Sequence, residues 1–245
     1  AVPIIVAGGI WWLSEWMEFM DNPEIGPVAF QFGTRPMVTI ESPLHIGVKK
    51  KLMSLGEGGV KLQKFSPTGF YSSAVENRLL RSLEDNLGRQ IPFSDEIDAA
   101  RGFDVPVELA RSGRTVYISG VDMPAMEKFV SGGFPVAMKT PARTLLFVSQ
   151  GRYDAILADM KGCSGCLSGC MFSGWSQRPE LKITPDPRSF CIQKSLQEMI
   201  HGGDPENTLL FSGQIVHRFK TDPFYKDGTF IPTVAQLFDR IRTGY

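Results

Sequence analysis

The feature that most constrains the fold is a pair of short apolar runs that each end in glycine. Residues 2–7 lead into Gly8-Gly9, and residues 28–32 lead into Gly33. Such runs predict strands of a parallel sheet that are buried on both faces. Because the carboxyl ends of parallel strands meet at one edge, we expect the two glycine loops to lie side by side. Glycine lets backbone N–H groups approach a phosphate closely, so the pair indicates a phosphate-bearing cofactor at the edge of a β/α barrel.

The composition and net charge argue against nucleic-acid and membrane partners. The 245 residues include 26 basic and 26 acidic side chains, so nucleic-acid binding driven by net charge is not expected. No apolar run approaches the roughly 20 residues of a membrane helix, so we expect a soluble protein without a membrane partner. The chain starts at Ala1 with neither an initiator methionine nor a signal peptide. We interpret it as a processed or truncated chain that begins in the middle of a barrel.

The pattern along the chain predicts four consecutive parts. Residues 1–55 are expected to form two βα units, 56–162 an α+β extension, 163–191 a cysteine loop and 192–245 a helical segment that packs back on the barrel. We expect Ser14 to cap a helix between the first two strands, and we interpret the basic run at 49–51 as a solvated helix face. The expected strands are 60–65, 114–119 and 144–148; the expected helices are 43–55, 71–87, 123–131, 150–160, 189–200 and 234–241; residues 91–104 are expected to be loop.

The cysteines are crowded into one stretch. Cys163, Cys166 and Cys170 form a C-x2-C-x3-C pattern, and Cys191 follows. This crowding indicates a metal or redox site in a reducing compartment rather than structural disulfides, so we expect a cytoplasmic protein. Thiolates at this spacing suit an iron–sulfur cluster or zinc, and metal-free redox-active thiols are the third interpretation.

Two stretches of the chain resemble one enzyme family. Residues 4–10 (IIVAGGI), 30–35 (FQFGTR) and 41–42 (ES) resemble the last two βα units of the nitronate monooxygenase family. That family was formerly called the 2-nitropropane dioxygenases, and its relatives include FMN-dependent enoyl reductases. Residues 190–196 (FCIQKSL) and 210–214 (LFSGQ) are similar to its C-terminal region, where a glutamine-containing helix precedes an A-G-Q turn. The resemblance is weakest in the middle of the chain.

The resemblance implies a TIM (β/α)8 barrel that binds FMN non-covalently. The phosphate-binding residues that it implies are Gly8, Gly9, Gly33 and Thr34, with Gln31 and Phe32 lining the same loop. Trp11-Trp12 depart from the family, which has small and acidic residues after the glycine pair. The C-x2-C-x3-C pattern resembles the [4Fe-4S] motif of other FMN-dependent barrel reductases, although Cys191 follows at a greater distance than the fourth cysteine does there.

The resemblance also implies the C-terminal portion of an FMN-dependent oxidoreductase that oxidises nitronates or a related small molecule. The family's catalytic histidine lies in a glycine-flanked motif on an earlier loop, and none of His45, His201 and His217 lies in such a motif. We therefore expect no catalytic residue in this chain, no activity of the chain alone, and the upstream part of the same barrel as its partner. Self-association into a homo-oligomer stays open. The alternatives are an FMN-dependent enoyl reductase of a lipid or polyketide synthase, and a non-enzymatic metal-binding interaction module.

Overall fold

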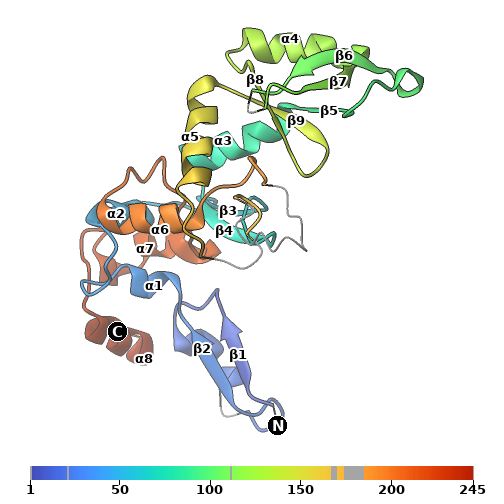
Figure 1. Ribbon diagram of the computed structural model, residues 1–245. Helices are drawn as coiled ribbons and strands as arrows, with labels where there is room; N and C mark the ends of the chain where they lie inside the picture. The colour runs from blue at the N-terminus through green and yellow to red at the C-terminus, as the bar shows by residue number, and fades with distance from the viewer. Residues whose placement is uncertain (1, 21, 111, 167–169, 174–184, 245) are drawn as a thin grey trace. The chain divides into compact units, whose positions relative to one another are not determined.

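The computed structural model describes residues 2–20, 22–110, 112–166, 170–173 and 185–244 (Figure 1). It is a mixed α/β structure of small sheets and short helices. The chain forms two compact units. Unit 1 comprises Ala1–Gln63, Ser72–Leu80 and Ser195–Tyr245, and unit 2 comprises Lys64–Tyr71 and Arg81–Lys194. Each unit thus combines segments that are distant in sequence, and the four consecutive domains expected above stay a prediction.

Unit 1 begins with the expected strand–helix–strand segment. Strands β1 (Ile4–Ala7) and β2 (Val28–Gln31) are parallel and in register from Ile4 opposite Val28 to Ala7 opposite Gln31. The connecting helix η1 (Leu13–Phe19) is a 3-10 helix. Among the described residues β1 and β2 form a sheet of their own, and no closed barrel is seen, so the TIM barrel stays a prediction.

The cap of η1 differs from the expected one. Trp12, not Ser14, is the N-cap residue, and its amide N–H donates to the Glu15 carboxylate over 3.3 Å. The Glu15 carboxylate is also hydrogen-bonded to Arg218, which holds it in place. The helix therefore starts earlier than the serine suggested because a long-range ion pair fixes the glutamate that caps it.

The rest of unit 1 packs helices around one hydrophobic core. Its further elements are α1 (Thr34–Met37), α2 (Ile46–Met53), β3 (Val60–Gln63), β4 (Ser72–Val75), η5 (Gln214–His217), α7 (Arg218–Thr221), η6 (Pro223–Tyr225) and α8 (Val234–Thr243). The core includes the fully buried Trp11, Leu52 and Phe219. Helix α2 confirms the helix expected over 43–55. The basic run at 49–51 was expected to be a solvated helix face, and this is wrong for Lys49. Its side chain is buried, and its Nζ donates to the carbonyl oxygens of Thr39 and Ser42 over 2.6 and 2.9 Å.

The helix expected over 71–87 is divided into two elements. Strand β4 pairs antiparallel with β3, with Val60 opposite Val75, and α3 (Arg78–Asp85) follows. Asn77 separates them, because its Oδ1 accepts a hydrogen bond from the Leu80 N–H over 2.9 Å. The apolar residues at helical spacing thus belong to a strand and a shorter helix, since pairing with β3 satisfies the backbone of 72–75.

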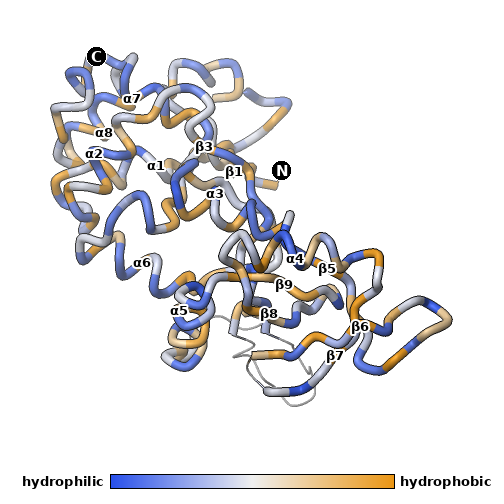
Figure 2. Tube along the Cα trace, turned by 90° about the horizontal axis from the view of Figure 1, so that it is seen from above, coloured by the Kyte–Doolittle hydropathy of each residue, from blue (hydrophilic) through white to orange (hydrophobic). Residues whose placement is uncertain are grey.

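The described residues of unit 2 form two antiparallel sheets. Strands β5 (Gln90–Pro92), β9 (Thr144–Val148) and β8 (Val136–Lys139) form one in the order β5-β9-β8, and β6 (Phe103–Glu108) pairs with β7 (Thr115–Ser119) in the other. Figure 2 shows β9 as a hydrophobic run, in agreement with its buried side chains. The expected strands 114–119 and 144–148 are present, but residues 91–104, expected to be loop, hold parts of β5 and β6.

The helices of unit 2 agree with the sequence pattern. Helices α4 (Met123–Ser131) and α5 (Gln150–Lys161) match the expected 123–131 and 150–160. Helix α6 (Ile192–His201) begins in unit 2 and ends in unit 1, and the short helices η2 (Asn86–Gly88), η3 (Ala99–Arg101) and η4 (Gly120–Asp122) connect the strands. Across the described ranges, no helix has both the length and the apolar character needed to cross a bilayer.

Candidate functional site

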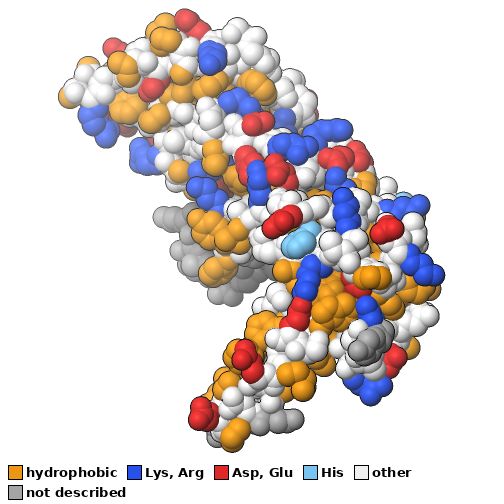
Figure 3. Space-filling model, turned by 180° about the vertical axis from the view of Figure 1, so that it is seen from behind, with side chains coloured by type: hydrophobic (Ala, Val, Ile, Leu, Met, Phe, Trp, Pro, Cys, Tyr) orange, Lys and Arg blue, Asp and Glu red, His pale blue; other side chains and the backbone are white. Residues whose placement is uncertain are grey.

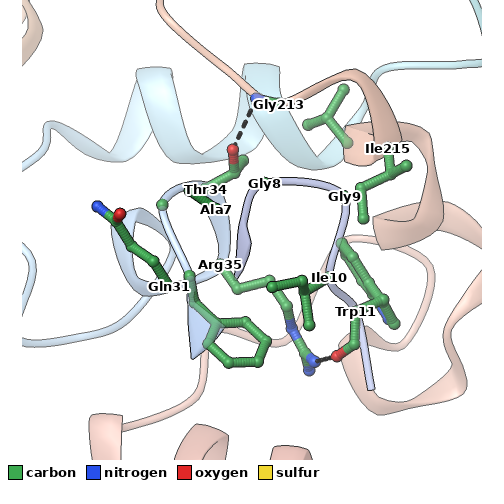
Figure 4. A pocket seen from close by; sticks show the side chains of 13 residues that line it. Ala7, Gly8, Gly9, Ile10, Trp11, Gln31, Thr34, Arg35, Gly213 and Ile215 are labelled. Atoms are coloured by element: carbon green, nitrogen blue, oxygen red, sulfur yellow. Dashed lines mark hydrogen bonds between the residues drawn. The ribbon is translucent and has the colours of Figure 1, made fainter. Parts of the chain in front are cut away.

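The two glycine loops of unit 1 line one pocket of about 210 Å3 (Figure 4). Because β1 and β2 are parallel and in register, the loops that follow them emerge at the same edge of the sheet. All six residues expected at the phosphate site line this pocket: Gly8, Gly9, Gln31, Phe32, Gly33 and Thr34. The adjacency of the loops was predicted from the strand pattern and is confirmed; the binding of a ligand there stays a prediction.

Gly8 and Gly9 differ from Gly33 in whether the backbone conformation favours glycine. Gly8 and Gly9 have φ of +85° and +71°, a left-handed conformation that favours glycine in any tight turn. Gly33 has φ of −97° and ψ of −59°, which every residue type adopts readily. A Cβ built on Gly33 would have no heavy atom within 4 Å. Neither backbone strain nor internal packing therefore requires glycine at position 33, and the space beside it is open.

The loop backbone supplies hydrogen-bond donors. In the described part of the chain, no backbone hydrogen bond outside the strand ladder involves the amide N–H of Gly8, Gly9 or Gly33. Successive amide groups in a glycine-rich turn form a concave donor surface that suits an anion. A Cβ at Gly8 or Gly9 would also meet open space. The open cradle and its donor set therefore fit a phosphate group.

A third segment meets the second loop. The Gly213 N–H donates to Thr34 Oγ1 over 2.8 Å, and Gly213, Ile215 and Val216 line the pocket. Gly213 lies in the LFSGQ stretch that resembles the family's A-G-Q turn, but the sequence did not indicate it as a site residue. The feature of the sequence that could have indicated Gly213 is its place after an apolar run. Such a glycine does not by itself reveal a contact with Thr34, 179 residues earlier.

Arg35 also lines the pocket and is a site residue that the sequence analysis did not single out. Its side chain is buried, with 2% of the residue exposed. Nε donates to the Tyr225 hydroxyl over 3.0 Å, Nη1 donates to the Trp11 carbonyl, and Nη2 lies 3.9 Å from the Asp222 carboxylate. The guanidinium group thus connects the second glycine loop to the segment after the first and to η6.

Asp222 is shared by several donors. Trp11 Nε1 donates to its Oδ2 over 3.0 Å, and Arg240 Nη2 donates to its Oδ1 over 3.2 Å. The guanidinium carbons of Arg35 and Arg240 lie 4.6 and 4.5 Å from the centre of the Trp12 ring, which is cation–π geometry. The C-terminal helix α8 is therefore fastened, through Arg240, to the same buried group that lies beside the pocket.

Burial shifts the pKa values of Arg35 and Tyr225 in opposite directions. Burial lowers the pKa of Arg35, and the neighbouring Tyr225 and Asp222 act against that change. Burial raises the pKa of Tyr225, which keeps its hydroxyl protonated. Because an arginine pKa starts far above neutrality, Arg35 stays a cation at physiological pH.

The four cysteines have different environments in unit 2. Cys170 is buried beside Phe172, Cys191 packs partly buried against the same hydrophobic cluster, and Cys166 is exposed. Cys163 Sγ lies 3.2 Å from the Ser173 hydroxyl. Within the described ranges, no group of three or more His, Cys, Asp or Glu side chains is arranged to hold a metal. Thiolate sites commonly assemble only when the metal binds, so the iron–sulfur or zinc site at Cys163, Cys166, Cys170 and Cys191 stays a prediction.

Comparison of the chain with protein-family models, with curated proteins and with solved structures finds no significant match. The resemblance to nitronate monooxygenases therefore stays an interpretation of the residues themselves.

Proposed function

We propose that this chain is the C-terminal portion of an FMN-dependent oxidoreductase of the nitronate monooxygenase type, and that the glycine-loop pocket binds the FMN phosphate. The observation that carries the proposal is Gly33. It lines the pocket in a backbone conformation that every residue type adopts, and a Cβ there would meet no neighbour. As the N-cap of α1 the position accepts glycine but favours serine, aspartate or asparagine. Close approach of a ligand to the backbone is a physical reason for glycine, in place of those side chains, at such a position.

The chain's own groups would bind and orient the phosphate. The amide groups of Gly8, Gly9 and Gly33 would donate to its oxygens. The Thr34 hydroxyl oxygen already accepts a hydrogen bond from Gly213, so its own proton remains available for donation to a phosphate oxygen. When bound, FMN would supply the electron transfer itself, and the protein would hold its phosphate end in place.

We propose further that β1 and β2 are neighbouring strands of the TIM barrel, completed by the upstream part of the same protein. Parallel sheets are normally covered on both faces. Here Ile4 and Ile5 are 44% and 68% exposed, and hydrophobic side chains are visible on the part of the molecule that carries these strands (Figure 3). Closure of the barrel by further strands, with their helices on the outside, would cover these side chains and would bring the catalytic base. Cross-linking mass spectrometry of the complete protein should connect β1 to upstream residues; links from β1 to this chain alone would contradict the proposal.

The direct test is the flavin content of the purified protein. We expect the yellow colour and visible absorption bands of bound flavin, and FMN in the supernatant after denaturation. Gly33→Ala should lower the flavin content, whereas Gly56→Ala should not. Gly56 is a matched control because it lies in unit 1, outside the pocket, and a Cβ there would also meet open space. A colourless wild-type protein that takes up no added FMN would refute the proposal.

The substrate class requires a second assay. We propose oxidation of nitronates or a related small molecule, measured as oxygen consumption with alkyl nitronates. Reduction of an enoyl thioester by a nicotinamide nucleotide, without nitronate turnover, would instead identify an enoyl reductase of a lipid or polyketide synthase. A protein that binds metal but no flavin would be the non-enzymatic metal-binding module. The crowded thiols agree with a reducing compartment such as the cytoplasm.

A further inference from the structure

The side chain of Arg35 joins the two walls of the glycine-loop pocket. Arg35 follows Gly33 and Thr34 directly, so its backbone belongs to the second loop. Its Nη1 donates to the carbonyl oxygen of Trp11, which comes two residues after Gly9. In Figure 4 the Arg35 side chain extends from one loop to the chain segment that leaves the other. The relative position of the two loops therefore depends on this hydrogen bond as well as on the β1–β2 ladder.

The Arg35 guanidinium group, which makes the hydrogen bond to Trp11, also contacts Tyr225 and Asp222. Nε of Arg35 donates to the Tyr225 hydroxyl, and Asp222 lies 3.9 Å from Nη2. A guanidinium group offers its donors in a rigid planar fork, whereas a lysine ammonium is a single point of attachment on a flexible stem. Lysine at position 35 would keep the charge, but it could not hold Trp11 and Tyr225 in this arrangement at the same time.

The group also carries an excess of positive charge. Arg35 and Arg240 are two buried or nearly buried cations that share one carboxylate, Asp222. Arg35 Nη2 has no hydrogen-bond partner among the described residues. A buried charge that is incompletely compensated is unfavourable, and an anion in the adjoining pocket would compensate it. The charge balance therefore favours an anionic ligand over a neutral one.

We propose that Arg35 is a positioning residue of the glycine-loop pocket: it holds the first loop against the second in the arrangement that binds a phosphate. The identity of the ligand rests on the proposed function; the positioning of the loops does not.

The test compares Arg35→Lys with Tyr225→Phe, which leaves Arg35 in place but removes one of its partners. Arg242→Lys is the control, because Arg242 is an exposed arginine of α8 paired with Asp239, outside the pocket. The probes are FMN and, separately, inorganic phosphate. We expect Arg35→Lys to raise the Kd for FMN at least about tenfold, Tyr225→Phe to raise it less, and the control to leave it unchanged.

Amide hydrogen exchange of the ligand-free proteins is the second readout. In Arg35→Lys we expect faster exchange in residues 8–12 than in the wild type, with unchanged exchange in β3 and β4. A merely structural role would change exchange throughout unit 1 and would not single out the first loop. If Arg35→Lys does not fold, Tyr225→Phe carries the same comparison.

The outcomes separate the two proposals. Wild-type exchange in residues 8–12 of a folded Arg35→Lys protein would overturn the positioning role, as would wild-type affinity for FMN. If the wild type binds neither FMN nor phosphate, the proposed function fails. In that case the exchange of residues 8–12 still decides whether Arg35 positions the loop.

Discussion

Replacement of Gly33 by alanine separates a ligand-binding glycine from a structural one. Gly33 is the N-cap residue of α1 with φ of −97°, and its missing Cβ faces open space. The methyl group of alanine therefore meets neither strain nor a clash in the ligand-free protein. It would, however, stand in the pocket next to the amide group that we assign to the phosphate. Binding should change while the fold does not.

The expected changes in unfolding free energy and in FMN affinity follow from the surroundings of position 33 without and with bound phosphate. Loss of glycine's freedom in the unfolded chain stabilises the protein by about 0.4–1 kcal/mol, and loss of a favourable N-cap glycine costs about as much. We therefore expect the free energy of unfolding to change by less than about 1 kcal/mol. A phosphate oxygen about 2.9 Å from the Gly33 nitrogen would be crowded by the new methyl group, so we expect the Kd for FMN to rise at least about tenfold, equivalent to about 1.4 kcal/mol. Gly33→Val, which adds a branched side chain, should have a larger effect.

The assay is titration calorimetry or flavin fluorescence with FMN, together with urea unfolding of the same preparations. Gly56→Ala controls for the general effect of removing a glycine in unit 1. Two results would refute the reasoning. One is a Gly33→Ala protein that binds FMN as the wild type does. The other is a Gly33→Ala protein whose unfolding free energy falls by several kcal/mol, because the position would then be structurally required.

Three further predictions concern other parts of the chain. Anaerobically purified protein should contain either iron with acid-labile sulfide or zinc, and Cys166→Ser should reduce that content; protein without either metal would exclude a metal site at the cysteines. The hydrogen bond from Arg218 lowers the pKa of Glu15 below its ordinary 4.5, so the stabilisation by this pair is present above that pH and is lost as the pH falls through the pKa of the folded state. Glu15→Gln should therefore make the urea-unfolding free energy less dependent on acid pH, and an unchanged slope would contradict this. Asn77→Ala should lower the unfolding free energy by about 2–4 kcal/mol, because buried Asn77 donates to the carbonyls of residues 205 and 208 and caps α3; a loss under about 0.5 kcal/mol would contradict that role.

Much of the local structure could be predicted because the signals are local. Apolar runs bounded by glycine predicted β1 and β2, and apolar spacing with polar flanks predicted α2, α5 and α8. The meeting of the two glycine loops followed from the same pattern, since parallel strands end at one edge. The pocket that these loops line was thus predicted from two short segments alone, and the binding of a phosphate there stays a prediction.

Other elements could not be predicted because pairing partners decide them. Residues 72–75 have an apolar spacing that suits a helix, but they form β4 because β3 lies beside them. Strands β5 and β8 are short segments without clear alternation, and both are held by the central strand β9. A backbone segment of three or four residues takes the conformation that its neighbour in the sheet imposes, and its own sequence contributes little to the choice.

The sequence by itself determined where the chain turns sharply and which two short apolar runs form the parallel strands β1 and β2. Gly8 and Gly9 are required by their left-handed backbone conformation. The apolar runs before them and before Gly33 form the expected strands, but no residue of either run is buried in unit 1, contrary to the burial expected from their sequence. Only the tertiary structure decided which residues surround the buried Arg35 side chain beside the pocket. Arg35 meets Tyr225, which follows 190 residues later, and this contact leaves no periodic signal in either segment. A lone arginine in a sequence is ordinarily a solvated side chain, and burial becomes favourable only when a carbonyl, a hydroxyl and a carboxylate from distant segments are brought around it.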